Sequence, residues 1–285
     1  MRLVTYDDGR AGVLRGDRVV DLGGRTMLDV ITGGIPGGVP EAAGTPLDRV
    51  RLRAPVLDPS KIIAAPVNYR DHQAEMSVDS QVGVLGFFLK APSSILDPGG
   101  TVQLPYHDRR FDQEGELALV IGRTARRVGE DTALDHVFGY TGLLDITMRG
   151  GEDRSTRKSF ETFTPMGPVL VTADEFGDPA DVDLRCWVNG DLRQDANTRD
   201  LIWSAARLVS YASWVTTLHP GDIITTGTPA GVGPLAAGDA IRLRLSGLGP
   251  DLAVAVRADA AVASHTAGRD RGPVPPPPPV PGAAR

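Results

Sequence analysis

Two glutamates stand two positions apart in the stretch FDQEGELALV (residues 111–120), where an apolar run begins. Alternate residues of a strand point to one face, so Glu114 and Glu116 are predicted to share a face with Ala118 and Val120. One interpretation is a solvated strand end. The other is a partly buried pair, in which the carboxylates repel each other unless a cation joins them. Hard divalent cations such as Mg²⁺ take oxygen ligands, but two are too few on their own.

A third acidic residue stands in the stretch GYTGLLDITMRG, where Asp145 follows an apolar and aromatic run. A carboxylate in such a run is costly without a partner. The alternative is an aspartate in a turn, but turns favour glycine or asparagine neighbours, and Leu143 and Leu144 are neither. Asp145 is therefore a candidate third ligand for a cation.

The stretch NYRDHQAE contains a candidate general base. His72 and Glu75 are three residues apart and become neighbours on one face if the segment is helical. A carboxylate beside an imidazole fixes its tautomer and raises its basicity, which suits proton abstraction. The alternative is a solvated surface pair.

Two further stretches offer positive charge or hydrogen-bond donors. Lys158 precedes an aromatic-rich segment in RKSFETFTPMGP, where a solvated lysine is the alternative. The stretch TTGTPAGVG, residues 225–233, offers backbone N–H groups and threonine hydroxyls to an anion, where a simple tight turn is the alternative. It lacks the GK[ST] sequence and is not a P-loop.

The elements that position these residues can be predicted from local patterns. Residues 1–50 alternate short apolar segments with turns and are predicted to form a small N-terminal β lobe. Residues 51–267 form the main body, with a helix that begins at Asn68 as N-cap, a helix over residues 201–218, and β-strands. Those strands are predicted at KIIAAPV, ELALVIG, PVLVTA, IITTG, RLRLSGLG and LAVAVRA. Residues 268–285 are proline-rich and are predicted to be disordered and dispensable for folding and catalysis.

The composition limits the class of protein. Of 285 residues, 41% are hydrophobic and 23% charged, as in soluble globular proteins, and the net charge of −6 offers no basic surface for nucleic acid. The single cysteine, Cys186, excludes an intrachain disulfide and a CxxC metal site. The N-terminal stretch carries charges where a signal peptide needs an apolar segment, and no apolar run is long enough to span a bilayer. We therefore expect a cytoplasmic protein that binds no membrane.

Taken in order, the stretches of this chain resemble the fumarylacetoacetate hydrolase family over roughly residues 60–245. The matching blocks are NYRDHQAE, FFLKAPSSI, FDQEGELALVIGR, GYTGLLDITMR, RKSFETFTPMGP, VNGDLRQDANTRDLIWS and LHPGDIITTGTPAGVGP. The resemblance implies an α+β, β-rich fold with a rolled, barrel-like mixed β-sheet and flanking helices, and a homodimer.

The resemblance also implies roles for individual residues. The family's metal-binding carboxylates match Glu114, Glu116 and Asp145, which would hold Mg²⁺ or Mn²⁺. Its base dyad matches His72 and Glu75. Its cations beside the oxyanion match Lys158 and Arg149. The substrate contacts that we expect are Tyr69, Lys90, Gly227 and Thr228.

The chain departs from the family pattern at three places beside these residues. Leu144 replaces an asparagine before the metal-binding aspartate, and Pro66-Val67 replaces Gly-Leu before Asn68. After Arg149, residues 150–152 read Gly-Gly-Glu where the family commonly reads Asp-x-Gln. Two small residues leave volume and add backbone freedom, so we expect a looser active-site wall that suits a bulkier or different substrate.

The predicted reaction is hydrolysis of a C–C bond in a β-dicarbonyl or acylpyruvate-type small molecule, through a metal-stabilised enolate. The same site would serve decarboxylation of a β-keto acid or keto–enol isomerisation. A non-catalytic metal-binding scaffold, with the proline-rich segment recruiting a partner, is the alternative of another class. The presence of His72, Glu75 and Lys158 argues against it, because a scaffold needs no base.

Overall fold

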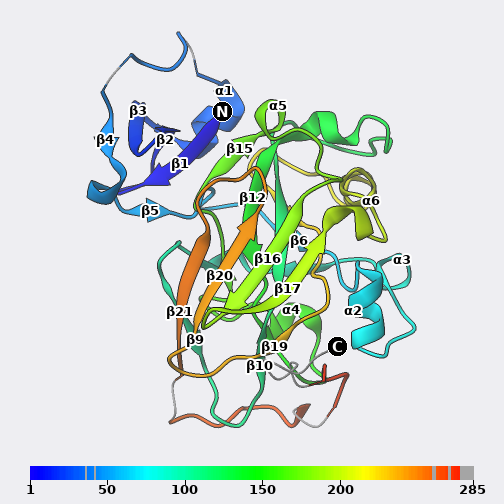
Figure 1. Cartoon of the computed structure of the whole chain (residues 1–285). Helices are drawn as coiled ribbons and strands as arrows, with labels where there is room; N and C mark the ends of the chain where they lie inside the picture. The colour runs from blue at the N-terminus through cyan, green and yellow to red at the C-terminus, as the bar shows by residue number, and fades with distance from the viewer. Residues whose placement is uncertain (36, 42, 259–260, 269–270, 277–285) are drawn as a thin grey trace.

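The computed structural model describes residues 1–35, 37–41, 43–258, 261–268 and 271–276. Two mixed β-sheets form most of this structure, and short helices lie at their edges (Figure 1). The predicted β-rich α+β class is confirmed.

The larger sheet contains eleven of the described strands. Its order is β4 (Thr45–Pro46), β3 (Arg18–Thr26), β2 (Arg10–Arg15), β1 (Arg2–Tyr6), β15 (Leu170–Thr172), β12 (Val137–Leu144), β11 (Gly115–Ile121), β18 (Ile223–Thr225), β6 (Ile62–Ala64) and β7 (Phe88–Lys90), and β5 (Leu52–Arg53) pairs with β1. Neighbours are antiparallel except β18 and β6. The N-terminal strands continue into the main body because β1 pairs with β15, with Leu3 opposite Leu170.

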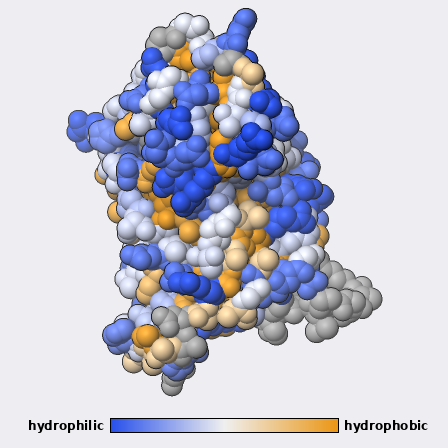
Figure 2. Space-filling model, turned by 90° about the vertical axis from the view of Figure 1, so that its left-hand side faces the viewer, coloured by the Kyte–Doolittle hydropathy of each residue, from blue (hydrophilic) through white to orange (hydrophobic). Residues whose placement is uncertain are grey.

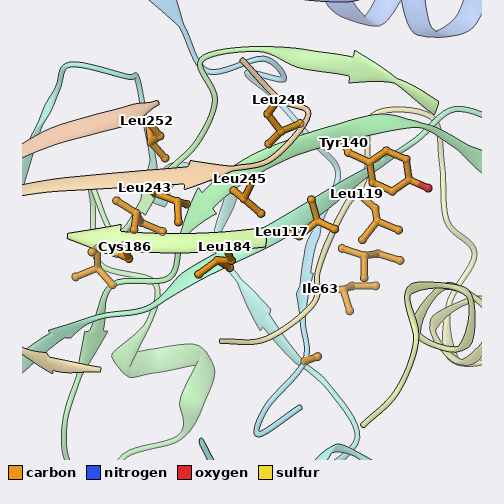
Figure 3. Packing of buried hydrophobic residues seen from close by; sticks show 14 of the residues in the cluster. Ile63, Leu117, Leu119, Tyr140, Leu184, Cys186, Leu243, Leu245, Leu248 and Leu252 are labelled. Atoms are coloured by element: carbon orange, nitrogen blue, oxygen red, sulfur yellow. The ribbon is translucent and has the colours of Figure 1, made fainter. Parts of the chain in front are cut away.

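A second sheet of five strands packs on the centre of the larger one. Its order is β17 (Asp191–Asn197), β16 (Asp183–Val188), β20 (Ala240–Leu245), β21 (Leu252–Ala258) and β9 (Thr101–Leu104). Figure 3 shows Leu184 of β16 and Leu243 of β20 beside Leu117 of β11 in the core between the sheets. Burial alternates along β20 and β21, as expected for a sheet with one solvated face.

Strand β11 is buried at every position because both of its faces are covered. Leu117 and Leu119 join the cluster between the two sheets. Ala118 and Val120 join a second cluster, which includes Leu3 from the N-terminal strands. Glu114 and Glu116 therefore stand at the start of a central, doubly covered strand.

Smaller elements complete the described structure. Strands β13 (Thr147–Met148), β10 (Phe111–Gln113) and β19 (Gly233–Pro234) form one small sheet, and β14 (Thr164–Pro165) pairs with β8 (Ile95–Leu96). The α-helices are α1 (Met27–Gly33), α2 (Arg70–Glu75), α3 (Val82–Leu85), α4 (Arg154–Arg157), α5 (Ala173–Phe176) and α6 (Ala205–Val215). The 3₁₀-helices are η1 (Leu47–Arg49), η2 (Pro92–Ser94), η3 (Ala133–His136) and η4 (Thr198–Asp200).

Two details of the predicted architecture differ from the structure. Within the described ranges the larger sheet ends at β4 and β7 and the smaller at β17 and β9, so closure into a barrel is not confirmed. Helix α6 begins at Ala205, four residues later than predicted, because the Ser204 side chain accepts a hydrogen bond from the Arg207 N–H and caps it there.

Hydrophilic residues, with hydrophobic ones between them, cover the face shown in Figure 2. No helix among the described residues has the length and apolar character needed to cross a membrane.

Candidate active site

Three buried carboxylates meet where β11 begins and β12 ends. Glu114 directly precedes β11, Glu116 is its second residue, and Asp145 follows β12. The antiparallel pairing of Gly115 with Leu144 brings them together, and the Asp145 N–H donates to the Glu114 carbonyl (2.8 Å). One ligand oxygen from each of the three carboxylates lies within 4.8 Å of the others.

Gly115 allows the second sheet to approach the back of this cluster. A Cβ at this position would lie 2.8 Å from Leu243 Cδ1 of β20, closer than real contacts allow. The Gly115 N–H donates to Gln194 Oε1 of β17 at 2.9 Å. The glycine between the two glutamates therefore allows this close packing, and its N–H bonds the carboxylate segment to β17 of the second sheet.

Two lysines neutralise part of the carboxylate cluster. The Lys158 ammonium donates to Glu114 Oε2 (2.7 Å) and to Asp145 Oδ2. The Lys90 ammonium donates to Asp145 Oδ1 (2.5 Å) and to the Phe163 carbonyl (3.1 Å). Lys90 is buried beside Asp145 and does not line the pocket, so in this structure it positions a carboxylate, and its expected contact with substrate stays a prediction.

Arg149 holds Glu114 from another side. Its Nη2 donates to Glu114 Oε1 (2.8 Å), and its Nε donates to Asp112 Oδ2 (2.6 Å). Burial favours the neutral carboxyl, but Lys158 and Arg149 outweigh it and hold the pKa of Glu114 well below its usual range.

Glu116 is the least compensated member of the cluster. Its Oε2 accepts the Gly227 N–H (3.0 Å), and it forms no ion pair in the described part of the chain. Burial, together with repulsion from Asp145, raises the pKa of Glu116 to about 8. The cluster is thus an all-oxygen donor set in which Glu116 has no paired cation among the described residues, and such a set fits a hard divalent cation.

The predicted base dyad is formed on α2. His72 Nδ1 lies 2.9 Å from Glu75 Oε2, and Glu75 Oε1 accepts the Gly231 N–H at 2.8 Å. The helix begins at Arg70 with Tyr69 as N-cap, so the prediction of Asn68 as N-cap is wrong. The Asn68 side chain bonds instead to the backbone of Trp203 and Thr226 and joins distant segments to the start of α2.

The glycine-rich loop supports the site more than it faces the pocket. Thr228 lines the pocket, but its hydroxyl donates to the Gly115 carbonyl (3.0 Å) and accepts from Gln194 (2.7 Å). The Gly227 N–H is used by Glu116. The Tyr69 hydroxyl is buried without a hydrogen-bond partner in the described structure, and Tyr69 does not line the pocket. Of the four expected substrate contacts, Thr228 alone lies at the pocket surface.

A pocket of about 390 Å³ joins the carboxylates to the dyad. Its lining residues are Ala65, Pro66, Val67, His72, Met76, Val78, Asp79, Ser80, Leu85, Phe88, Glu114, Glu116, Arg149, Arg154, Arg157, Lys158, Thr228 and Pro273. Val67 has a φ of 46°, a left-handed conformation that is costly for a β-branched residue, and such strain concentrates at functional sites. Our sequence analysis missed Arg154 and Arg157, although the basic stretch RSTRK was a visible signal.

The Gly-Gly-Glu departure after Arg149 does not loosen the pocket wall, and that prediction is wrong. None of residues 150–152 lines the pocket. A Cβ on Gly151 would lie 2.6 Å from Arg271 Cβ, and the Gly151 N–H donates to the Gly268 carbonyl at 2.9 Å. The C-terminal segment therefore fills the space that the glycines leave.

The C-terminal segment reaches the pocket mouth. Pro273 lines the pocket, and Arg110 Nη1 donates to the Pro275 carbonyl at 3.0 Å. Gly268, Arg271, Pro273 and Pro275 thus contact the body, and the predicted disorder of residues 268–285 stays a prediction. The predicted disordered residues 269–270 and 277–285 lie outside the described part of the chain.

A chain that ends at Ala267 lacks Pro273, which lines the pocket, and we expect its KM to be roughly tenfold higher than that of the parent. A tenfold change corresponds to a loss of only about 1.4 kcal/mol of binding free energy. A chain that ends at Pro276 is the matched control and should keep the parental KM. Steady-state kinetics of both truncations test this. Parental kinetics of the shorter chain would show that the segment from residue 268 is dispensable, as its composition suggested.

Comparison with known proteins finds a matching family model and similar sequences that agree with each other. The sequence model described as "Fumarylacetoacetate (FAA) hydrolase C-terminal" matches residues 61–255. The chain is 41% identical over 286 residues to a maleylpyruvate hydrolase of Aquipseudomonas alcaligenes, covering 90% of this chain and 99% of that protein. It is 39% identical over 213 residues to a mitochondrial oxaloacetate tautomerase of Xenopus laevis, covering 70% of this chain and 66% of that one.

A solved structure shares the fold. The maleylpyruvate hydrolase of Sphingobium sp. SYK-6, crystallised in complex with manganese(II) and pyruvate, superposes with a TM-score of 0.80 at 42% identity, covering 90% of this chain and 99% of that one. The family model matches residues 61–255, and the two maleylpyruvate hydrolases each cover 90% of the chain. The chain therefore belongs to the fumarylacetoacetate hydrolase family.

Proposed function

We propose that this protein is a divalent-metal-dependent hydrolase that cleaves the C–C bond of an acylpyruvate. The observation that carries the proposal is one pocket lined by Glu114 and Glu116 of the carboxylate cluster and by His72 of the dyad. Two hydrolase relatives at 41% and 42% identity, one of them solved with manganese and pyruvate, support it.

Glu114, Glu116 and Asp145 would hold the metal ion, which we propose to be Mn²⁺ or Mg²⁺. When bound, the ion supplies Lewis-acid polarisation of the keto acid oxygens. Lys90 and Arg149 keep the Asp145 and Glu114 carboxylates in place through short ion pairs. These contacts orient the donor oxygens before substrate enters the pocket.

His72 is the proposed general base. The carboxylate of Glu75 accepts a hydrogen bond from Nδ1–H, which leaves Nε2 as the proton acceptor. His72 takes a proton from water as the water oxygen attacks the acyl carbonyl carbon. Glu75 stabilises the imidazolium that results, and the Gly231 N–H holds Glu75 in position.

Cleavage then completes the reaction. The bond between the acyl carbon and the pyruvyl methylene carbon breaks, and its electron pair goes to the methylene carbon. The His72 imidazolium returns a proton to that carbon, so the products are pyruvate and the carboxylic acid of the acyl group, which releases its proton to solvent. Lys158 and Arg149, which line the pocket, place positive charge beside the oxyanion that develops during attack.

Keto–enol tautomerisation is the second candidate, because the tautomerase relative is 39% identical and the same base would move the proton. The two reactions differ in water: hydrolysis adds it, whereas tautomerisation and decarboxylation do not. The homodimer and the cytoplasmic location expected from the sequence stay predictions.

Hydrolysis in ¹⁸O-labelled water distinguishes these reactions. With Mn²⁺ and an acylpyruvate, we expect one labelled oxygen in the new carboxylate, beyond the carbonyl exchange seen in a control without enzyme. Mass spectrometry of the products measures it. Release of carbon dioxide, or a product isomer of unchanged mass, would contradict the hydrolase assignment.

A further inference from the structure

Asp112, on strand β10, is a buried carboxylate that lies next to the proposed metal site without belonging to it. It is 0% exposed and precedes Glu114 by two positions, so carboxylates stand at 112, 114 and 116 in one alternating series. It is not one of the three carboxylates whose oxygens lie within 4.8 Å of one another. A buried carboxylate is costly unless it is paired, so the partners of Asp112 indicate its role.

Two arginines hold Asp112. Arg149 Nε donates to its Oδ2 at 2.6 Å, and Arg110 Nε donates to its Oδ1 at 2.7 Å. The backbone fixes this arrangement, because the Arg149 N–H donates to the Arg110 carbonyl at 2.8 Å. Strands β10 and β13 also pair Asp112 with Thr147. The small sheet therefore determines where Asp112 meets Arg149.

The guanidinium of Arg149 is divided between two carboxylates. In an arginine, the Nε hydrogen and one Nη2 hydrogen point to the same side, and together they can bind a single carboxylate through two parallel hydrogen bonds. In this structure Nε bonds to Asp112, whereas Nη2 bonds to Glu114 Oε1 at 2.8 Å. Asp112 thus occupies one of the two donors that Glu114 would otherwise take.

The bond between Arg149 and Glu114 affects metal binding because a metal ion must compete with it. Both oxygens of Glu114 accept from cations, Oε1 from Arg149 and Oε2 from Lys158 at 2.7 Å. Within the described residues, the carboxylates that pair with Arg149 are Asp112 and Glu114. Without the charge of Asp112, the guanidinium would turn both donors to Glu114, and the metal ion would have to displace a two-bond ion pair.

We propose that Asp112 is a positioning residue, which acts through Arg149 to keep Glu114 available to the metal ion. It binds Nε and offsets part of the positive charge that Arg149 places beside the site. This inference rests on the proposed metal-dependent function. It assigns a role to a residue outside both the metal ligands and the dyad.

Calorimetric titration of Mn²⁺ into metal-free protein tests the proposal without any substrate. Asp112→Asn keeps the shape of the side chain and removes its charge. We expect its Kd for Mn²⁺ to be about 10- to 100-fold above the parental value, the usual cost of losing a group that orients a metal ligand. A parental Kd in Asp112→Asn would overturn the inference.

Asp222→Asn is the matched control for the loss of a buried aspartate. Asp222 is also 0% exposed and forms an ion pair, with Lys61, but it does not line the pocket. This variant should lose stability and keep the parental Kd for Mn²⁺. A Kd raised as far as that of Asp112→Asn would show that any buried aspartate has this effect, and would overturn the inference.

A double-mutant cycle shows whether Asp112 acts through Arg149. In an Arg149→Met background, the change Asp112→Asn should leave the Kd for Mn²⁺ unchanged, because the guanidinium that it would release is gone. A direct effect of the Asp112 charge on the ion would persist in that background. The same fold increase in Kd with and without Arg149 would therefore overturn the inference.

Arg110→Gln tests the same contact without removing a buried carboxylate, since the Arg110 side chain is 25% exposed. Asp112 then keeps Arg149 as its ion-pair partner among the described residues, so the Kd for Mn²⁺ should fall below the parental value. A Kd above the parental value would overturn the inference.

The parent protein separates failure of this inference from failure of the proposed function. If the parent binds no Mn²⁺, the metal assignment falls and this inference falls with it. If the parent binds Mn²⁺ and Asp112→Asn binds it equally well, the metal assignment stands and the role of Asp112 alone is overturned.

Discussion

Replacement of His72 by alanine is expected to lower kcat by about 10²- to 10⁴-fold, the usual contribution of general acid–base catalysis, and to leave Mn²⁺ binding unchanged. The imidazole lies on α2 and bonds to Glu75, whereas the carboxylates proposed to bind the metal lie where β11 begins and β12 ends. Removing the base therefore leaves the metal ligands and their ion pairs in place. Steady-state kinetics and Mn²⁺ titration of the same preparation measure the two effects.

Two companion variants sharpen this test of the dyad. Glu75→Gln should retain the hydrogen bond to Nδ1 but lose the negative charge, so its kcat should fall by less than that of His72→Ala. His136→Ala, in η3 and away from the pocket, should match the parent. Parental turnover of His72→Ala would mean that the dyad is structural only.

The second large effect is expected at Glu116, where loss of function and gain of stability should go together. Glu116→Gln should abolish most of the activity and the stabilisation by Mn²⁺, which amounts to about 2.7 kcal/mol at a metal concentration 100 times the Kd. In EDTA the same variant should unfold at a higher temperature than the parent, because it removes a group whose ionisation is opposed by burial and by Asp145. Thermal unfolding with and without Mn²⁺ tests both statements.

The stability that Glu116→Gln gains over the parent in EDTA should depend on pH in one direction. The pKa of Glu116 rises from 4.5 to about 8 on folding, so ionisation of this group opposes folding. Its contribution to stability is fully present below pH 4.5 and is lost as the pH rises through 8. In EDTA the difference in unfolding temperature between Glu116→Gln and the parent should therefore increase as the pH rises from 4.5 to about 8. Glu152→Gln, outside the pocket, is the control and should keep the Mn²⁺ stabilisation. An equal Mn²⁺ shift and equal activity in Glu116→Gln would contradict the metal assignment.

The strands and the carboxylate cluster could be predicted because their signals are local. Same-face alternation placed Glu114 and Glu116 together, and helical spacing placed His72 beside Glu75. Both patterns depend only on residues two or three positions apart. The apolar run before Asp145 indicated the third carboxylate, and the order of the seven matching blocks indicated the family.

The errors arose where the partner of a residue is distant in the chain. Asn68 has the composition of an N-cap, but its amide bonds to Trp203, 135 positions away. Gly150 and Gly151 indicated an open wall, whereas Gly268 and Arg271 fill it. Lys90 is charged and lies within the matching block FFLKAPSSI, yet Asp145 accepts its hydrogen bond away from the pocket lining. Local pattern does not encode these pairings, which depend on how the whole chain folds.

The two halves of the pocket differ in how firmly the fold holds them. The carboxylates stand on central strands, with β11 buried at every position and paired on both sides. The dyad stands on the six-residue helix α2, which has no side-chain N-cap and is held mainly through Asn68 and Glu75. Local opening is least costly where few buried contacts must break. Displacement of α2 should therefore cost less free energy than displacement of β11, so the half of the site that holds the dyad is the easier one to open.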